Sequence, residues 1–219
     1  MPDLYKRHDL LNVHPQAWAV VLARRPDLDG IPHLRDWARQ RRPVIVRRRH
    51  SDEEPGCVAV GLPLPPADGK RRIDLALPTN AVHARPPVAL RQVATRCPAA
   101  WSTSLADVLN LASRLGLVPY VFGSLLWQSV TGLPYLAEKS DLDLLWPVDG
   151  AIPRDLLSGL AAIESQAPMR IDGDILLPGG GGVNWRELHA APPEGTVLVK
   201  HIDHLALSTA SALLAGDGS

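Results

Sequence analysis

The sequence predicts an α+β protein with a small β-rich N-terminal domain and a C-terminal domain in which helices flank a mixed sheet. Short β-branched runs separated by Gly and Pro dominate the first hundred residues. Apolar stripes at helical spacing are best marked after residue 100, where the charge balance also changes. A length of 219 residues is sufficient for two small domains, which we place at residues 1–98 and 99–219.

The N-terminal domain is predicted to contain one helix and three strands. The helix is placed at Ile31–Gln40. The strands are expected at the β-branched runs Pro43–Arg49 and Cys57–Gly61, and at Arg72–Leu77, which alternates with period two. These patterns predict a small β-containing domain.

The C-terminal domain is predicted to alternate helices and strands. Ser104 is the expected N-cap of a helix that Gly116 ends, and Pro153 is expected at the first position of a later helix. The Gly179–Gly182 run reads as a hairpin tip. The elements expected in order are helix Leu105–Leu115, strand Val118–Phe122, helix Leu125–Thr131, strand Asp141–Trp146, helix Arg154–Ser165, strand Arg170–Leu177, strand Val197–Lys200 and helix Asp203–Leu214.

Composition excludes several classes of protein. No window approaches the roughly 18 apolar residues of a spanning helix, and the N-terminal segment lacks the apolar core of a signal peptide. Cys57 and Cys97 stand alone, without the paired spacing of a zinc site or a disulfide framework. We therefore expect a cytoplasmic protein with no membrane partner.

The formal net charge of zero conceals a division of charge. Residues 1–100 carry 17 Lys and Arg against 10 Asp and Glu, whereas residues 101–219 carry 6 against 13. The basic half is suited to an anionic ligand or to a solvated sheet edge, and overall neutrality speaks against nucleic acid. The candidate anion-binding side chains are Arg47, Arg49, Lys70, Arg71 and Arg72.

Three features of the C-terminal half predict one kind of site. Gly123 and Ser124 lie between an expected strand and a helix, where backbone N–H groups point at a phosphate. Asp141 and Asp143 alternate on a strand, so both carboxylates share a face and repel each other unless a cation lies between them. The later strand Arg170–Leu177 carries a further acidic pair, Asp172 and Asp174. Hard carboxylate ligands favour Mg²⁺.

The order of these features is that of the nucleotidyltransferase fold. The stretches Val121–Leu136 and Lys139–Trp146 resemble the malonate decarboxylase holo-acyl-carrier-protein synthase family, also called phosphoribosyl-dephospho-CoA transferase. Asp172–Asp174, Val183–Glu187 and Arg7–Leu11 also resemble this family, so the likeness spans nearly the whole chain.

The resemblance implies a phosphotransferase of the nucleotidyltransferase type. Its substrate would be 2′-(5″-triphosphoribosyl)-3′-dephospho-CoA, its acceptor a serine of the apo acyl carrier subunit of malonate decarboxylase, and pyrophosphate would be released. Asp141 and Asp143 would hold two Mg²⁺ ions, and Gly123 and Ser124 would bind phosphate. By strand position, Asp172 is the choice for a third catalytic and metal-binding carboxylate, with Asp174 as the alternate.

Two other functions remain open from the sequence. One is a nucleotidyltransferase that acts on a small molecule or an RNA end. The other is a non-catalytic module that binds the CoA derivative or the carrier protein. A departure from the wider fold pattern bears on this choice, because 16 residues separate Ser124 from Asp141. The turn at Gly132–Tyr135 has to be accommodated between them.

Overall fold

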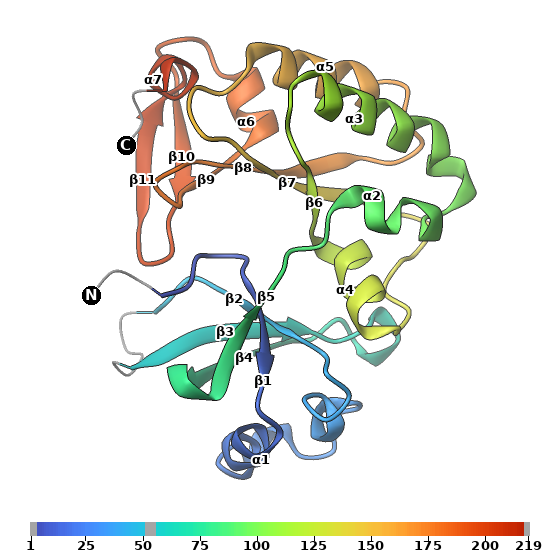
Figure 1. Cartoon of the computed structure of the whole chain (residues 1–219), viewed down its shortest axis with the longest axis vertical. Helices are drawn as coiled ribbons and strands as arrows, with labels where there is room; N and C mark the ends of the chain where they lie inside the picture. Colours follow the sequence, from blue (N-terminus) through green and yellow to red (C-terminus); the bar gives the residue numbers. More distant parts are fainter. Residues whose placement is uncertain (1–3, 51–55, 217–219) are drawn as a thin grey trace. The chain divides into compact units, whose positions relative to one another are not determined.

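The structure is a computed structural model that describes residues 4–50 and 56–216. The chain forms two compact units. One comprises residues up to Pro87 together with Val130–Pro134, and the other comprises Val88–Ser129 and the residues from Tyr135 onward. The domain ranges 1–98 and 99–219 stay a prediction. Each unit is built around its own sheet, and the α+β class is confirmed (Figure 1).

The first unit contains a five-stranded sheet in the order β4-β3-β2-β1-β5, in which every neighbouring pair is antiparallel. The three predicted strands are confirmed, and along β4 exposed and buried residues alternate strictly. Two strands were not predicted from the sequence, β1 and β5. The bounds are β1 Leu10–Val13, β2 Val44–Val46, β3 Cys57–Pro63, β4 Arg72–Pro78 and β5 Val82–Arg85.

The helix predicted at Ile31–Gln40 is wrong, because only the 3₁₀ turn Leu34–Asp36 forms there. His33 adopts a φ of 64°, which interrupts a right-handed helix. Trp37 is fully buried instead, and its indole N–H donates to the Pro43 carbonyl at 2.9 Å. The helix of this unit is α1, Pro15–Ala23. Its apolar residues form no clear stripe and Trp18 is its one buried residue, so periodicity gave no signal.

The second unit contains a six-stranded mixed sheet in the order β11-β10-β9-β8-β7-β6. The pair β7 and β8 is parallel, and the other pairs are antiparallel. The bounds are α2 Leu90–Val93, α3 Ser102–Arg114, β6 Tyr120–Val121, α4 Gly123–Thr131, β7 Leu142–Pro147, α5 Arg154–Glu164, β8 Ile171–Leu176, β9 Gly182–Asn184, α6 Trp185–Ala190, β10 Thr196–Lys200, β11 Leu205–Thr209 and α7 Ala210–Ala215. Short 3₁₀ turns complete the two units at Pro26–Leu28, Leu34–Asp36, Pro66–Asp68, Thr79–Ala81, Ala94–Arg96 and Ala99–Trp101.

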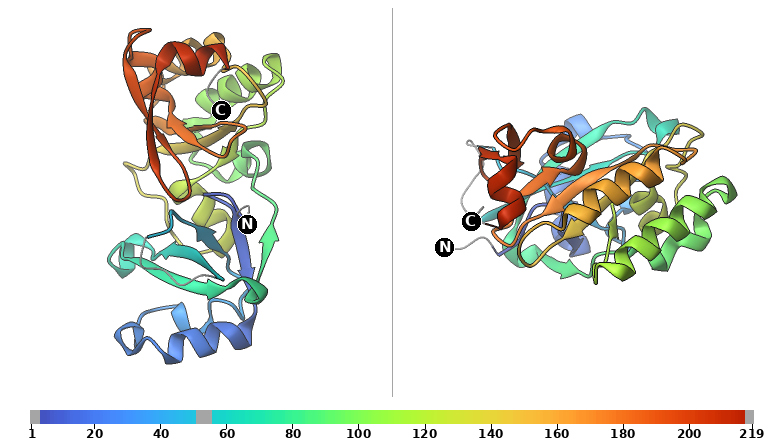
Figure 2. Two further views of the ribbon diagram at one scale, coloured as in Figure 1. Left: turned by 90° about the vertical axis from the view of Figure 1, so that its left-hand side faces the viewer. Right: turned by 90° about the horizontal axis from the view of Figure 1, so that it is seen from above.

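Helices α3, α5 and α6 pack together over one face of this sheet (Figures 1 and 2). Leu142 and Leu144 of β7 and Ile171 of β8 are completely buried on the apolar face. Side chains alternate along a strand, so Asp143 and Asp172 project from the opposite face. Burial of the apolar residues therefore fixes the direction of the two carboxylates.

Several expected boundaries move. Ser104 is not an N-cap, because α3 begins at Ser102 directly after a 3₁₀ turn and Ser104 is buried in its first turn. Pro153 is the N-cap of α5 rather than its first residue. The expected strand at Val118–Phe122 shortens to β6, whereas Gly116, with a φ of 66°, follows α3 as predicted. These shifts leave the order of the predicted elements in this part of the chain unchanged.

The final helix predicted at Asp203–Leu214 is also wrong in its first half. Residues Leu205–Thr209 form β11, which pairs residue for residue with Thr196–Lys200. Only Ala210–Ala215 is helical, capped by the Thr209 hydroxyl, which accepts from the Ala212 N–H at 3.3 Å. Leu205 and Leu207 lie two residues apart, which is the period of a strand.

The predicted hairpin tip is confirmed, since the Leu177 N–H donates to the Gly181 carbonyl at 2.8 Å between β8 and β9.

Within the parts of the chain that the structure describes, no helix combines the length and the apolarity needed to cross a bilayer.

Candidate active site

The candidate site lies on the polar face of the second unit's sheet. Asp143 of β7 is directly in register with Asp172 of the parallel strand β8, and Asp174 lies two residues further along the same face. Asp141 precedes β7 by one residue and shares the alternation of Asp143. The structure thus places Asp143, Asp172 and Asp174 on two adjacent strands and Asp141 directly before the first of them.

Asp143 is in an unfavourable environment for a negative charge. The pKa of its carboxyl group is raised to about 6, mainly by burial and in addition by the neighbouring carboxylates of Asp141 and Asp172. The guanidinium of Arg170 acts in the opposite direction. A carboxylate that is buried among like charges is stabilised by any cation that reaches it.

Gly123 abuts the carboxylate of Asp143. The Phe122 N–H donates to the Asp143 carbonyl at 2.9 Å, which brings the turn after β6 alongside β7. A Cβ on Gly123 would lie 2.7 Å from Cγ of Asp143, and the φ of Gly123 is 56°. Only glycine, which has no Cβ, tolerates both this close approach to Asp143 and the positive φ. The predicted order of strand, Gly123–Ser124 turn and helix is therefore confirmed, and phosphate binding by this turn stays a prediction.

The long spacer between Ser124 and Asp141 is anchored to helix α4. The Gln128 side-chain oxygen accepts from the N–H groups of Tyr135 and Leu136 at 3.1 and 3.0 Å. Tyr135 is buried, with its ring centroid 6.3 Å from that of Trp127. The additional residues therefore fold back on α4, and Gly123 still contacts Asp143.

Asp172 is held by three donors. Its Oδ1 accepts from the Gly173 N–H and from Nδ2 of Asn184, each at 2.8 Å. Its Oδ2 lies 3.0 Å from Nη2 of Arg170. The carboxylate is therefore held in one orientation within a partly buried setting.

Asp174, the alternate third carboxylate, is placed differently. Only 7% of the residue is exposed, and its Oδ1 lies 3.4 Å from Nζ of Lys200 on β10. Its partner in register is Leu145 rather than an acid. Asp174 thus lies beside an apolar residue and an ammonium group, whereas Asp172 faces Asp143.

Arg186 brings a further cation to the start of β8. It forms an ion pair with Glu164, and its Nε donates to the Ile171 carbonyl at 3.2 Å. Burial lowers the pKa of the Arg186 guanidinium, and the charge of Asp141 opposes this shift. Arg170, Arg186 and Lys200 therefore surround the acidic residues.

Sequence analysis did not assign a role to Arg170, Arg186 or Asn184. One of them, Asn184, carries a local signal. Asn184 and Glu187 have the spacing of a helix N-terminus, and α6 does begin at Trp185 with Asn184 as its N-cap. Their proximity to the acids depends on the pairing of β8 with β9, which the local sequence does not reveal.

A cation at this site would need ligands beyond the protein. Among residues 4–50 and 56–216, no three His, Cys, Asp or Glu side chains are grouped closely enough to hold a metal ion by themselves. Mg²⁺ in phosphoryl-transfer sites is typically held by one or two carboxylates together with water and substrate phosphates. Asp143 and Asp172, in register on adjacent strands, are suited to that arrangement.

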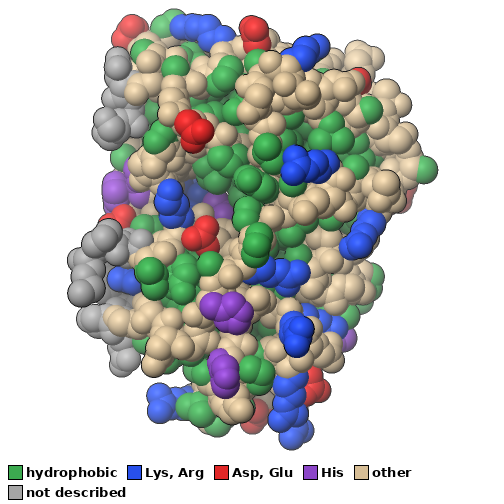
Figure 3. All heavy atoms as spheres, in the orientation of Figure 1, with side chains coloured by type: hydrophobic (Ala, Val, Ile, Leu, Met, Phe, Trp, Pro, Cys, Tyr) green, Lys and Arg blue, Asp and Glu red, His purple; other side chains and the backbone are tan. Residues whose placement is uncertain are grey.

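The predicted basic residues all lie in the first unit. Arg47 is engaged within it, since its Nε donates to the Val60 carbonyl at 3.3 Å and lies 3.5 Å from Oδ1 of Asp74. Arg49 donates to the Cys57 carbonyl at 3.1 Å. Lys70, Arg71 and Arg72 are exposed. On the face shown in Figure 3, Lys and Arg side chains are spread out rather than gathered in one patch. A phosphate-binding role for these residues stays a prediction.

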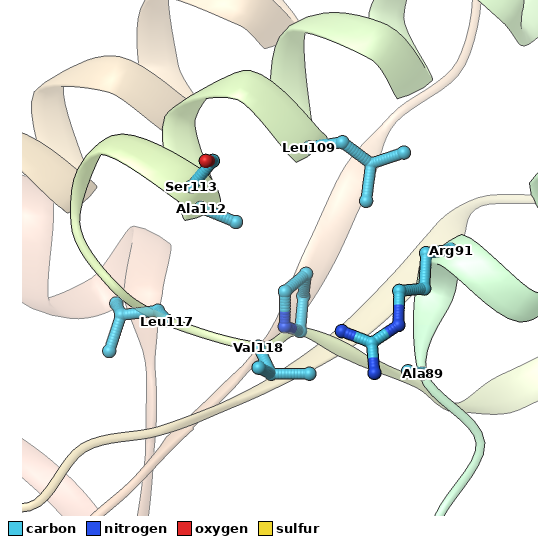
Figure 4. Close-up of a pocket in the computed structure, with 8 residues that line it drawn as sticks. Ala89, Arg91, Leu109, Ala112, Ser113, Leu117 and Val118 are labelled. Atoms are coloured by element: carbon cyan, nitrogen blue, oxygen red, sulfur yellow. The ribbon is translucent and has the colours of Figure 1, made fainter.

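A groove of the second unit is lined by other residues than the acidic ones (Figure 4). It is formed by α2, the C-terminal half of α3 and the segment before β6. Arg91 is the one charged side chain among the residues that line it. The groove contains no carboxylate that would hold a metal ion for phosphoryl transfer. The lining residues are Ala89, Arg91, Leu109, Ala112, Ser113, Leu117, Val118 and Pro119.

Two family models together cover nearly the whole chain. Residues 6–95 match the phosphoribosyl-dephospho-CoA transferase MdcG N-terminal domain, and residues 89–211 match the phosphoribosyl-dephospho-CoA transferase MdcG C-terminal domain. The acidic residues and the Gly123 turn fall in the second match.

Curated relatives with the same description align along most of the chain. A phosphoribosyl-dephospho-CoA transferase of Bradyrhizobium diazoefficiens is 40% identical over 213 residues, which are 96% of this chain and 92% of the relative. One of Xanthomonas campestris pv. campestris is 40% identical over 184 residues, 83% of this chain and 85% of the relative. One of Pseudomonas aeruginosa is 33% identical over 150 residues, 64% and 66% of the two chains.

No solved structure matches the chain significantly. Both family models and relatives that are 40% identical nevertheless agree along nearly its full length. The chain therefore belongs to the phosphoribosyl-dephospho-CoA transferase family.

Proposed function

We propose that the protein transfers the phosphoribosyl-dephospho-CoA group from its triphosphate precursor to a serine of the apo acyl carrier subunit of malonate decarboxylase. Membership of the transferase family supports the donor. The observation that carries the proposal is the position of Asp143, which lies between the Gly123 turn and Asp172 with a raised pKa. This is a site for a cation and a polyphosphate together.

The proposed transfer is a substitution at the α-phosphorus of the donor. The serine hydroxyl oxygen forms a bond to the α-phosphorus, and the bond from that phosphorus to the oxygen bridging to the β-phosphate breaks. Pyrophosphate leaves with the bond's electron pair, and the serine proton passes to a base. Catalysis of such a step rests on alignment and on neutralising the charge of the phosphate oxygens.

The acidic residues would supply the metal ligands. Mg²⁺ held by Asp143 and Asp172, with Asp141 beside them, would withdraw charge from the transferred phosphate. Asp172 is the better third carboxylate because it is in register with Asp143, whereas Asp174 is in register with Leu145. Asp172 is also a candidate to accept the serine proton, since it is partly exposed on the same face.

The Gly123–Ser124 turn would hold the leaving group. Helix α4 begins at Gly123, so its first N–H groups are not used by the helix itself. Ser124, which is half-buried, adds a hydroxyl to these donors. Donors of this kind bind phosphate oxygens, and they stabilise pyrophosphate as it leaves.

The direct test is a mass measurement on the acceptor. Purified apo carrier subunit is incubated with the protein, Mg²⁺ and the triphosphoribosyl donor. The expected result is an increase by the mass of one phosphoribosyl-dephospho-CoA group, with release of pyrophosphate. A carrier whose acceptor serine is replaced by Ala is the control and is expected to remain unchanged.

The same assay separates the alternatives. Transfer from labelled ATP or CTP to a small molecule or an RNA end, with no change in the carrier, would indicate another nucleotidyltransferase. Binding of the donor without release of pyrophosphate would indicate a non-catalytic module. Either outcome contradicts the proposed reaction.

A further inference from the structure

Asn184 connects the acidic site to helix α6. It is the last residue of β9, in register with Asp174 of β8, so its side chain lies on the same face of the sheet as the acids. Its Nδ2 donates to Oδ1 of Asp172 at 2.8 Å and to the Gly173 carbonyl at 3.2 Å. Its Oδ1 accepts from the N–H groups of Arg186 and Glu187 at 3.0 and 3.3 Å.

The chemistry of the partners fixes the orientation of this amide. Backbone N–H groups can only donate, so the side-chain oxygen has to face α6. A carboxylate and a carbonyl can only accept, so the side-chain nitrogen has to face Asp172 and Gly173. Aspartate, serine or threonine would also cap the helix. Of these residues, only asparagine caps the helix and presents an amide N–H₂ to Asp172.

The consequence for Asp172 is that its two oxygens are no longer equivalent. Oδ1 is occupied by the N–H of Gly173 and the amide of Asn184. Oδ2 pairs with the guanidinium of Arg170. Asp172 itself is in register with Asp143 across the parallel strands β7 and β8. The Asn184 amide and the Gly173 N–H therefore set the rotation of the Asp172 carboxylate.

We propose that Asn184 is a positioning residue, which holds Oδ1 of Asp172 so that Oδ2, which pairs with Arg170 here, is the oxygen that exchanges this partner for a divalent cation opposite Asp143. This inference rests on the proposed function, because it takes Asp172 to be a metal ligand. Residues that hydrogen-bond to metal ligands contribute to metal affinity by orienting those ligands. Asn184 does so from the N-terminus of α6, which ties the site to the packing of that helix.

The test separates orientation of Asp172 from stability of the helix. Asn184→Ala removes the cap and the N–H donor, whereas Asn184→Ser keeps a capping oxygen and removes the amide. Thr209→Ala is the matched control, because it removes the side-chain cap of α7, where Thr209 accepts from the Ala212 N–H. Mn²⁺ affinity is measured by electron paramagnetic resonance, and thermal unfolding is measured alongside it.

The expected result is that Asn184→Ala and Asn184→Ser both weaken Mn²⁺ binding by about 10- to 100-fold. Asn184→Ser should retain the thermal stability that Asn184→Ala loses, and Thr209→Ala should bind Mn²⁺ like the wild type. In the transfer assay, Asn184→Ser should need more Mg²⁺ for half-maximal rate and should recover at high Mg²⁺. Recovery by metal is not expected of a merely structural defect.

Unchanged Mn²⁺ affinity in Asn184→Ser would overturn the proposal. If Asn184→Ala does not fold, Asn184→Ser still decides, because it retains the cap. A wild-type protein that binds no Mn²⁺ would remove the metal assignment of Asp172 and this inference with it. The transfer reaction itself is tested separately, by the mass of the carrier.

Discussion

Replacing Asp143 by Asn is expected to lower the rate of transfer by at least about 10²- to 10³-fold, on the scale of losing one group that stabilises the transition state. Asparagine has nearly the same shape but lacks the charge that a cation requires. Asp143 is also enclosed by Gly123, Asp141 and Asp172. The rate is followed by the mass increase of the carrier subunit.

Asp107→Asn is the matched control for this experiment. Asp107 is exposed on helix α3, so its replacement removes one carboxylate from the same unit without altering the site. It is expected to transfer at the wild-type rate. Transfer by folded Asp143→Asn at a similar rate would remove Asp143 from the reaction.

The Asp143→Asn variant is expected to be more stable than the wild type at pH 8 in the absence of divalent cations. The pKa of Asp143 rises from 3.8 to about 6 on folding, so ionisation above pH 6 costs the folded state free energy. Below pH 3.8 the group is protonated in both states, and the difference disappears. The gain should develop between these pH values and amount to about 1–3 kcal/mol. Urea unfolding in EDTA across this range measures it.

Gly123→Ala is the second change with a large expected effect. The added methyl group would overlap the Asp143 carboxylate and would stand on a backbone with a φ of 56°. The left-handed backbone alone costs roughly 1–2 kcal/mol, and displacement of Asp143 adds to it. We expect both a lower free energy of unfolding and a rate of transfer reduced by at least about 10²-fold, because the carboxylate is moved away from its partners.

Gly132→Ala isolates the backbone contribution. Gly132 has a φ of 72°, but nothing lies within 4 Å of the position that a Cβ would take. This variant is expected to lose stability through strain alone and to transfer at nearly the wild-type rate. Equal effects of the two substitutions on activity would show that contact with Asp143 is unimportant.

The elements that local sequence predicts well are those whose own pattern matches their burial. Strand β4 alternates strictly, and β7 carries Asp143 between two completely buried leucines. The Gly123 turn was predictable because glycine, which lacks a Cβ, allows the tight backbone turn between a strand and a helix. These local signals place the acids of one strand and the turn that meets them.

The rest depends on pairing between distant segments. That Asp172 faces Asp143, and that Asn184 reaches Asp172, follows from the register of β7, β8 and β9. The error at Leu205–Thr209 has the same origin, since pairing with β10 makes a strand of residues that were expected to be helical. In the first unit, the positive φ of His33 overrides the apolar pattern of its segment.

The most direct test of the site is the position of a divalent cation in crystals of the protein grown with Mn²⁺ and the triphosphoribosyl donor. The anomalous scattering of manganese locates the ion independently of the protein's own electron density. We expect a peak between the carboxylates of Asp143 and Asp172, on the side of the Gly123 turn, with donor phosphate oxygens completing its coordination. Donor-bound crystals in which manganese lies elsewhere, while Asp143 and Asp172 contact only protein groups, would contradict this site.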